Sequence, residues 1–183
     1  MKLDPIWQAD IQQTHFRLLL DAMAHPGQRK PLKARPESGS VSLVVLATLL
    51  DAEVSLADPH NLLRCEDWNK LQVQSAPVES ADYILCDGSQ FPEFCPKIGT
   101  LPSPEKSATV ILMVDHIGYG FTRLKLSGPG IAETVDLDIE GVLPEWFARR
   151  EDWTCSFPLG VDFIMIDTTQ LVALPRTTKV EIM

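Results

Sequence analysis

Arg176, Thr177 and Thr178 stand together near the end of the chain, directly after Pro175. A guanidinium group beside two hydroxyls can hold a phosphate or a carboxylate through charge-assisted hydrogen bonds. The same arginine can instead pair with a carboxylate of the chain, or the segment can be a turn that ends a strand. The sequence therefore predicts ligand or partner binding at these three residues and leaves both structural alternatives open.

Gly128 and Gly130 lie in a Ser-Gly-Pro-Gly turn that follows an alternating apolar segment. Backbone N–H groups near glycines can bind an anion, so both residues are candidates for ligand or partner binding. The turn lacks the GxxxxGK[ST] pattern of a P-loop and the third glycine of a dinucleotide fingerprint. A hairpin turn whose glycines adopt positive φ explains the same residues.

Asp162 follows Phe-Pro-Leu-Gly-Val at the start of an expected strand. A partly buried carboxylate there can be an acid or a base, and it can instead pair with an arginine or bond to nearby backbone amides, so Asp162 is the sixth candidate site residue. His15 falls on the apolar stripe of an expected helix and is predicted to be a core residue. Ser103 and Lys106 match the S-x-x-K pattern of serine β-lactamases, but they lie in a proline-rich loop, and we treat the match as coincidence. No nucleophile elbow is present, so the catalytic residues are unknown.

The cysteines and histidines are scattered along the chain, without a CxxC pair or finger-like spacing. We therefore expect no metal site, and we expect the thiols to be buried in a reducing cytosol. The cysteines are Cys65, Cys86, Cys95 and Cys155.

The 183 residues carry a formal net charge of −9 and are 45% hydrophobic. An acidic surface repels a phosphate backbone, so no nucleic-acid partner is expected. The start of the chain has no apolar signal region, and the longest apolar stretch, residues 41–50, is too short to span a bilayer. We expect one domain over residues 1–183, in the cytoplasm and without membrane association.

The apolar pattern predicts an amphipathic helix over residues 10–24. Asp10 is expected to cap its start in a capping box with Gln13, and Pro26-Gly27 is expected to end it. Residues 28–40 are polar and hold two prolines, which predicts an exposed connection.

Later segments predict a mixture of helices and strands. Helices are expected over residues 41–53, where a strand is the alternative, and over 67–73 and 144–153. Strands are expected near 54–56 and over 83–86, 108–114, 121–126, 132–139, 161–166 and 171–174, the last two joined as a hairpin. Residues 90–105 hold four prolines, which predicts a structured loop or a short helical turn between loops. This order predicts an α/β fold in three layers, with a mixed β-sheet covered by helices.

Four segments, in this order, resemble the PhnH family of bacterial phosphonate-metabolism proteins. TLLDAEVSL at residues 48–56 is similar more loosely. The last two of the four segments, at their spacing, are the most specific part of the resemblance. The four are HFRLLLDAMAHPG at 15–27, LSGPGI at 126–131, FPLGVD at 157–162 and ALPRTTKVE at 173–181.

The resemblance implies a subunit of the carbon–phosphorus lyase core complex, with PhnG, PhnI and PhnJ as partners. With ATP and a further subunit, PhnL, that system attaches an alkylphosphonate to C1′ of the ribose and displaces adenine; PhnJ later breaks the C–P bond. The resemblance also implies a fold like the large domain of pyridoxal-phosphate-dependent transferases without the cofactor site, no cofactor, and a homodimer outside the complex. No catalytic residue carries over from it.

Two other functions remain open on the residues alone. A stand-alone phosphate- or pyridoxal-phosphate-binding enzyme would use the glycine turn and the Arg-Thr-Thr segment, and a small-molecule binding module would need only a pocket. An enzyme that did the phosphonate chemistry alone should show a triphosphate cradle or acidic metal-binding clusters, and neither pattern is visible. The lysines, including Lys125 and Lys179, stand in no pattern that marks a cofactor-binding lysine.

Overall fold

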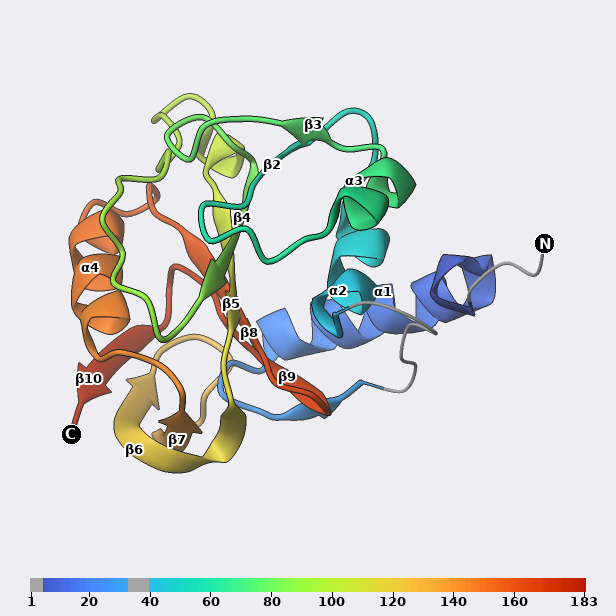
Figure 1. Ribbon diagram of the computed structural model, residues 1–183. Coiled ribbons are helices and arrows are strands. Elements are labelled where there is room, and N and C mark those ends of the chain that lie inside the picture. The colour runs from blue at the N-terminus through green and yellow to red at the C-terminus, as the bar shows by residue number, and fades with distance from the viewer. Residues whose placement is uncertain (1–4, 33–39) are drawn as a thin grey trace.

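A seven-stranded mixed β-sheet forms the middle layer of the protein (Figure 1). The structure is a computed structural model and describes residues 5–32 and 40–183. Strands β3, β2, β4, β5 and β8 run parallel, whereas β9 pairs antiparallel with β8 and β1. In sheet order the strands are β1 (Lys30–Pro31), β9 (Gln170–Leu174), β8 (Asp162–Ile166), β5 (Thr109–Met113), β4 (Tyr83–Asp87), β2 (Ser55–Ala57) and β3 (Gln74–Ser75).

The central strands are apolar along their length because both faces of the sheet are covered. In β5, Val110 and Leu112 belong to the core on one face, and Ile111 belongs to the core on the other. β8 alternates in the same way, with Phe163 on the first face and Ile164 on the second. Such near-continuous apolar runs are typical of parallel strands that are buried on both sides.

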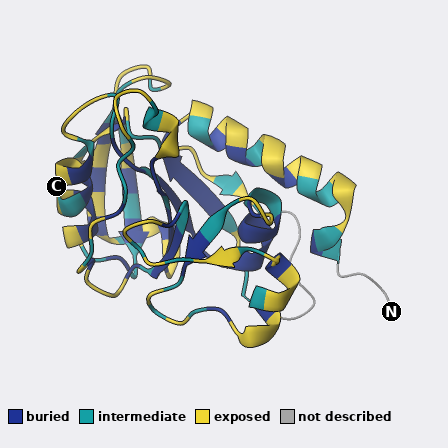
Figure 2. Cartoon of the chain, turned by 90° about the horizontal axis from the view of Figure 1, so that it is seen from above, coloured by how far each residue is buried: buried dark blue, intermediate teal, exposed yellow. Residues whose placement is uncertain are grey.

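Helices cover one face of the large sheet: η1 (Pro5–Trp7), α1 (Ala9–Ala24), α2 (Ser42–Leu49) and α3 (Cys65–Leu71). α1 is amphipathic; it buries Leu19 and Ala22 and, as Figure 2 shows, exposes its outer side. α2 is buried over most of its length, which agrees with its almost wholly apolar sequence.

A second sheet and one helix cover the opposite face. The sheet is antiparallel, with the order β10 (Lys179–Ile182), β6 (His116–Ser127), β7 (Val135–Glu140). α4 (Glu145–Thr154) lies in the same layer (Figure 1). It buries Trp146 and Trp153 in the core on this face of the large sheet. The α/β fold with a mixed sheet is therefore confirmed, but the prediction that helices cover the sheet holds fully for one face, since a small sheet shares the other face with α4.

Most predicted elements exist, and the errors concern their ends and the short strands; the helix expected over residues 41–53, for example, ends at Leu49. α1 begins after Gln8 without a side-chain cap bond, so the predicted capping box at Asp10 and Gln13 is wrong. Lys30 and Pro31, expected in an exposed connection, pair with β9; residues 33–39 of that connection lie outside the described residues. β6 begins at His116 rather than near Phe121. Register shifts interrupt the apolar–polar alternation in the first half of this strand, so the sequence pattern did not indicate it.

The thiols differ from the expectation. Cys86 is buried in β4, but Cys65, Cys95 and Cys155 are exposed, so the prediction of buried thiols is correct for one cysteine only. Burial raises the pKa of the Cys86 thiol well above its ordinary value. Within residues 5–32 and 40–183, no helix is long and apolar enough to cross a membrane.

Candidate functional site

The glycine turn between β6 and β7 packs against the end of α1. Gly130 has a φ of +83°, and a Cβ atom there would lie 2.4 Å from the carbonyl oxygen of Ala24 and 2.8 Å from the ring of Pro26. Gly27 lies just beyond the helix, and a Cβ atom there would lie 2.7 Å from the side chain of Leu126 and 3.1 Å from that of Val135. The first two of the four segments that carry the family resemblance are thus in direct contact.

The same turn also touches the Arg-Thr-Thr segment. A Cβ at Gly128, whose φ is +127°, would lie 2.9 Å from the carbonyl oxygen of Thr177 and 3.5 Å from Cα of Thr178. The expected positive φ of both glycines is confirmed. Glycine is required here because two backbones approach each other closely and the conformation is left-handed.

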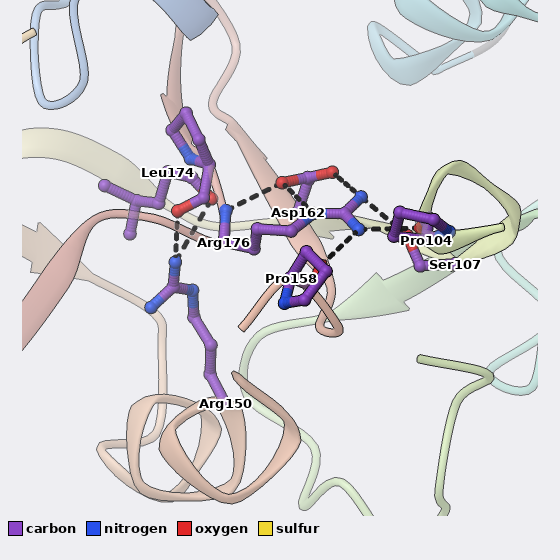
Figure 3. A network of polar contacts seen from close by, with 8 residues as sticks. Pro104, Ser107, Arg150, Pro158, Asp162, Leu174 and Arg176 are labelled. Atoms are coloured by element: carbon purple, nitrogen blue, oxygen red, sulfur yellow. Dashed lines mark hydrogen bonds and ion pairs between the residues drawn. The ribbon is translucent and has the colours of Figure 1, made fainter. Parts of the chain in front are cut away.

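Asp162 and Arg176 form an ion pair that joins the third and fourth segments (Figure 3). Nη2 of Arg176 lies 2.6 Å from Oδ2 of Asp162, and Nε donates to Oδ1 at 3.3 Å. The backbone N–H of Arg176 also donates to Oδ1, at 2.7 Å. The two side chains are only 18% and 15% exposed, so the pair is largely removed from water. Of the alternatives left open for Asp162, the pairing with an arginine and the bond to a backbone amide are both observed.

The remaining donors of the Arg176 guanidinium reach the loop that precedes β5 and the segment that precedes β8. Nη1 donates to the carbonyl oxygens of Pro104, at 2.8 Å, and Pro158, at 3.5 Å, and Nη2 donates to Oγ of Ser107, at 2.6 Å. A guanidinium has five N–H donors, and these contacts together with Asp162 engage all of them. Arg176 therefore holds three parts of the chain together, and it would have to release one of them to bind an outside anion.

Arg150, on α4, is a residue that the sequence reasoning missed. Arg150 is 2% exposed, and its guanidinium donates to the backbone carbonyls of Thr178, at 3.0 Å, and Pro175. Figure 3 shows it below the end of β9, where it also reaches the carbonyl of Leu174 at 3.5 Å. Burial lowers the pKa of this guanidinium to about 10, and the negative charge of Asp162 opposes part of that shift. Its spacing from Trp146 and Trp153 on the helix places Arg150 on the apolar face, which was the available signal.

A groove of about 710 Å³ lies between α4 and β10, next to this junction. We call it the α4–β10 groove. Of the predicted site residues it brings together Arg176, Thr177 and Thr178; Asp162, Gly128 and Gly130 do not line it. Its lining comprises Pro129, Phe147, Arg150, Glu151, Thr154, Cys155, Phe157, Arg176, Thr177, Thr178, Lys179, Val180 and Glu181.

The other candidates lie apart from the groove. His15 is 2% exposed on α1, and its Nδ1–H donates to the carbonyl of Ile11 at 2.9 Å, so its prediction as a core residue is confirmed. Ser103 and Lys106 flank and end the short helix η2 (Pro104–Lys106) in the loop before β5. Among the described residues, no three His, Cys, Asp or Glu side chains are grouped so that they could hold a metal ion.

The arrangement favours recognition over acid–base chemistry. The buried ionisable side chain of the α4–β10 groove is that of Arg150, and a guanidinium neither gives up nor accepts a proton near neutral pH. What the groove offers is a strand backbone, a helix face and a mixture of apolar and charged side chains. Such a surface can bind a ligand or a chain segment.

Comparison with known proteins gives a consistent result. The family model described as "Bacterial phosphonate metabolism protein (PhnH)" matches residues 6–181. The chain is 42% identical to a protein of Stutzerimonas stutzeri named putative C-P lyase subunit protein HtxG, over 97% of this chain and 89% of that one. It is 28% identical to a protein of Rhizobium meliloti (strain 1021) named alpha-D-ribose 1-methylphosphonate 5-triphosphate synthase subunit PhnH, over 97% of this chain and 92% of that one.

Proposed function

Because the chain belongs to the PhnH family of bacterial phosphonate metabolism proteins, we propose that it is a subunit of a carbon–phosphorus lyase core complex. In that complex it supports the transfer of an alkylphosphonate to C1′ of the ribose of ATP, with release of adenine. The chain is a supporting subunit and does not carry out the chemistry alone. Its partners are the subunits PhnG, PhnI and PhnJ, in the cytoplasm.

The observation that carries this proposal is the match of one family model to nearly the whole chain, residues 6–181. The contacts among the four family-like segments add a physical reason for it. Gly130 meets the end of α1, Gly128 meets Thr177, and Asp162 pairs with Arg176. Residues that are far apart in sequence thus build one junction. Close backbone contacts and an ion pair hold it together, as suits a subunit that contributes binding surfaces rather than catalytic groups.

We assign the six candidate residues to that role. Arg176, Thr177 and Thr178 contribute to a binding surface along the α4–β10 groove, and Asp162, Gly128 and Gly130 hold the segments behind it. A phosphate site at Arg176 has less support, since its guanidinium donors already have partners within the chain.

The proposal includes a homodimer outside the complex and a fold related to the large domain of pyridoxal-phosphate-dependent transferases, with no cofactor bound. A cofactor-binding lysine in such enzymes sits in a pocket with a shifted pKa. None of the lysines in the described ranges is buried, and Lys30 and Lys97 are paired with Asp21 and Asp82. Reduction with borohydride after incubation with pyridoxal phosphate should therefore leave no single stoichiometric adduct.

Reconstitution tests the proposed role. The other subunits, ATP and methylphosphonate are combined with and without this chain, and released adenine is measured. Adenine release that requires this chain, from a mixture in which the chain alone with ATP and methylphosphonate releases none, is the expected result. Equal adenine release in both mixtures would show that the chain is not needed, and release by the chain alone would show that it is the enzyme.

A further inference from the structure

We propose that the α4–β10 groove binds an extended segment of a partner protein, which adds to β10 as a fourth strand of the small sheet. The proposal deepens the proposed function, and it rests on it only in taking the partner to be another subunit. The geometry of the groove itself does not depend on the family.

β10 is an edge strand with open backbone groups. Among the described residues it pairs with β6 alone, and Lys179 lies opposite Ser127 in that ladder. The N–H of Met183 donates to the carbonyl of Arg123 on β6, at 2.9 Å. In an antiparallel ladder the backbone groups of alternate residues point the same way. Since Met183 points toward β6, Val180 and Ile182 point their N–H and C=O groups away from it.

Arg150 shows which way the open edge of β10 faces. Thr178 is two residues before Val180, so its backbone carbonyl points to the same side as that of Val180. This carbonyl accepts a hydrogen bond from Nη1 of Arg150 on α4, at 3.0 Å. The open edge of β10 therefore looks toward α4, across the groove. The arginine covers that edge at Thr178, and no hydrogen bond from residues 5–32 or 40–183 covers it at Val180 and Ile182.

The walls of the groove agree with that orientation. On α4 the lining residues Phe147, Arg150 and Glu151 recur at helical spacing, so one face of the helix forms a wall. On β10 the consecutive residues Lys179, Val180 and Glu181 all line it, as expected when the groove runs along the strand's edge rather than over one of its faces. A strand edge facing a helix is the arrangement in which several domain families bind extended peptides by strand addition.

The position of α4 selects the kind of occupant. Figure 1 shows α4, β10, β6 and β7 following one another on the same face of the large sheet. A second copy would have to bring its own three-stranded sheet into the space that α4 occupies. A single extended segment from another protein needs only the groove.

The side chains of β10 define the chemistry of that segment. Val180 packs partly against the core, so the residue opposite it should be apolar. Lys179 and Glu181 are exposed and point the other way, so an acidic residue opposite Lys179 and a basic one opposite Glu181 give complementary cross-strand pairs. The expected partner segment is therefore extended and alternates an apolar residue with flanking residues of opposite charge.

Two variants of one residue isolate the role of the strand edge. Val180→Pro removes the outward N–H and keeps the ladder with β6, since proline is tolerated where the N–H faces away from the sheet. Val180→Ala loses the same side chain and keeps the N–H, so it is the matched control. Circular dichroism and thermal unfolding establish that both variants fold.

The probe is an acetylated, amidated peptide, Thr-Val-Lys-Val-Glu-Thr, and its control is the same peptide N-methylated at the second valine. Amide chemical shifts of the isotopically labelled chain report its binding. We expect shifts at Val180, Ile182 and the groove-facing residues of α4, and binding at least about tenfold weaker for the methylated peptide and for Val180→Pro than for Val180→Ala. Shifts elsewhere, no binding, or equal binding by both peptides would contradict the proposal.

Hydrogen exchange in the assembled complex provides the second readout. The amides of Val180 and Ile182 should exchange quickly in the free chain and at least about tenfold more slowly in the complex. If the chain joins the complex and these amides stay fast, the groove proposal is wrong while the proposed function stands. If the chain joins no complex, the proposed function fails and the peptide titration alone decides on the groove. Protection that appears in a homodimer of the free chain would identify a second copy as the occupant and would overturn the proposal.

Discussion

Nη1 of Arg150 donates to the backbone carbonyl of Thr178 at 3.0 Å. A buried arginine of α4 thus holds the residue that directly precedes β10, on the side of the strand that faces the groove. The same guanidinium also reaches the carbonyls of Pro175 and Leu174. Arg150 thus spans the helix and the turn that leads into β10. Its burial is tolerated because several carbonyl oxygens solvate the charge in place of water.

Replacing this arginine tests its structural weight. Arg150→Met keeps most of the side-chain volume but leaves the carbonyls of Pro175 and Thr178 without their donor. We expect the free energy of unfolding to fall by about 2–4 kcal/mol in urea titrations. Arg149, one position away, pairs loosely with Asp152 and lies over the ring of Trp153 at 6.0 Å, both at partly exposed positions, so Arg149→Met should change it by less than about 1 kcal/mol. Equal losses for the two variants would show that the contacts of Arg150 carry no special weight.

The Asp162–Arg176 pair should be more strongly coupled than an exposed pair. A double-mutant cycle with Asp162→Asn and Arg176→Met should give a coupling energy of about 1.5–3 kcal/mol, because the pair is mostly buried and shares several hydrogen bonds. Arg123 and Asp138, whose side chains are 62% and 34% exposed, provide the comparison. Their cycle should give about 0–1 kcal/mol. Two cycles of the same size would argue against a structural role for the buried pair.

The glycine turn should not tolerate a side chain where it meets α1. Gly130→Ala places a Cβ 2.4 Å from the carbonyl oxygen of Ala24 in a left-handed conformation. We expect a loss of about 2 kcal/mol or more in unfolding free energy, together with chemical-shift changes at the end of α1. Pro129→Ala, at an exposed position of the same turn, should lose less than about 1 kcal/mol. A mild effect of Gly130→Ala would mean that the turn can move away from the helix.

Asp167 should make stability depend on acidity. Burial alone would raise the pKa of this carboxyl, but hydrogen bonds from Thr169, Gln170 and Ile117 outweigh it and hold the pKa below its ordinary value. A lowered folded-state pKa gives stability that is present above the ordinary range, near about 3.9, and is lost as pH falls through the folded value.

Substitution of Asp167 checks that sign. Asp167→Asn should destabilise the chain by about 1–3 kcal/mol at pH 7, and the difference from the parent should shrink in urea titrations as pH falls below about 4. Asp152→Asn, on a side chain that is 70% exposed, should have little effect at either pH. A difference for Asp167→Asn that grows toward acid pH would reverse the assignment.

Thiol reactivity should separate the cysteines into two groups. Cys65, Cys95 and Cys155 are exposed, whereas Cys86 lies in the central sheet with a raised pKa. Ellman's reagent should label three thiols of the native chain quickly and the fourth only on unfolding. Fast labelling of all four in the native state would show that β4 is accessible.

The sequence predicted best where a local pattern decides the structure. The stop of α1 at Pro26-Gly27 follows from proline and glycine chemistry, and the hairpins around Gly128 and after Asp167 follow from turn residues between apolar runs. The central strands follow from their β-branched content. These features need only a few neighbouring residues, so one sequence suffices.

The parts that the sequence did not predict depend on contacts between distant segments. β10 is a strand because it pairs with β6, and nothing in Lys179 to Ile182 alone required it. Asp162 and Arg176 are separate candidates in the sequence, and only the fold shows that they form an ion pair with each other. The sequence alone does not mark Arg150, because a charged residue on an apolar helix stripe gains a role only from its carbonyl partners, which lie in distant segments.

The mass of the assembly that this chain enters tests the central claim most directly. The chain is co-expressed with PhnG, PhnI and PhnJ under phosphate starvation, purified through a tag on PhnJ and weighed by native mass spectrometry. The account predicts a single assembly that contains this chain in fixed stoichiometry with the other three subunits. An assembly of the other three that forms without it, with this chain eluting separately, would contradict the account.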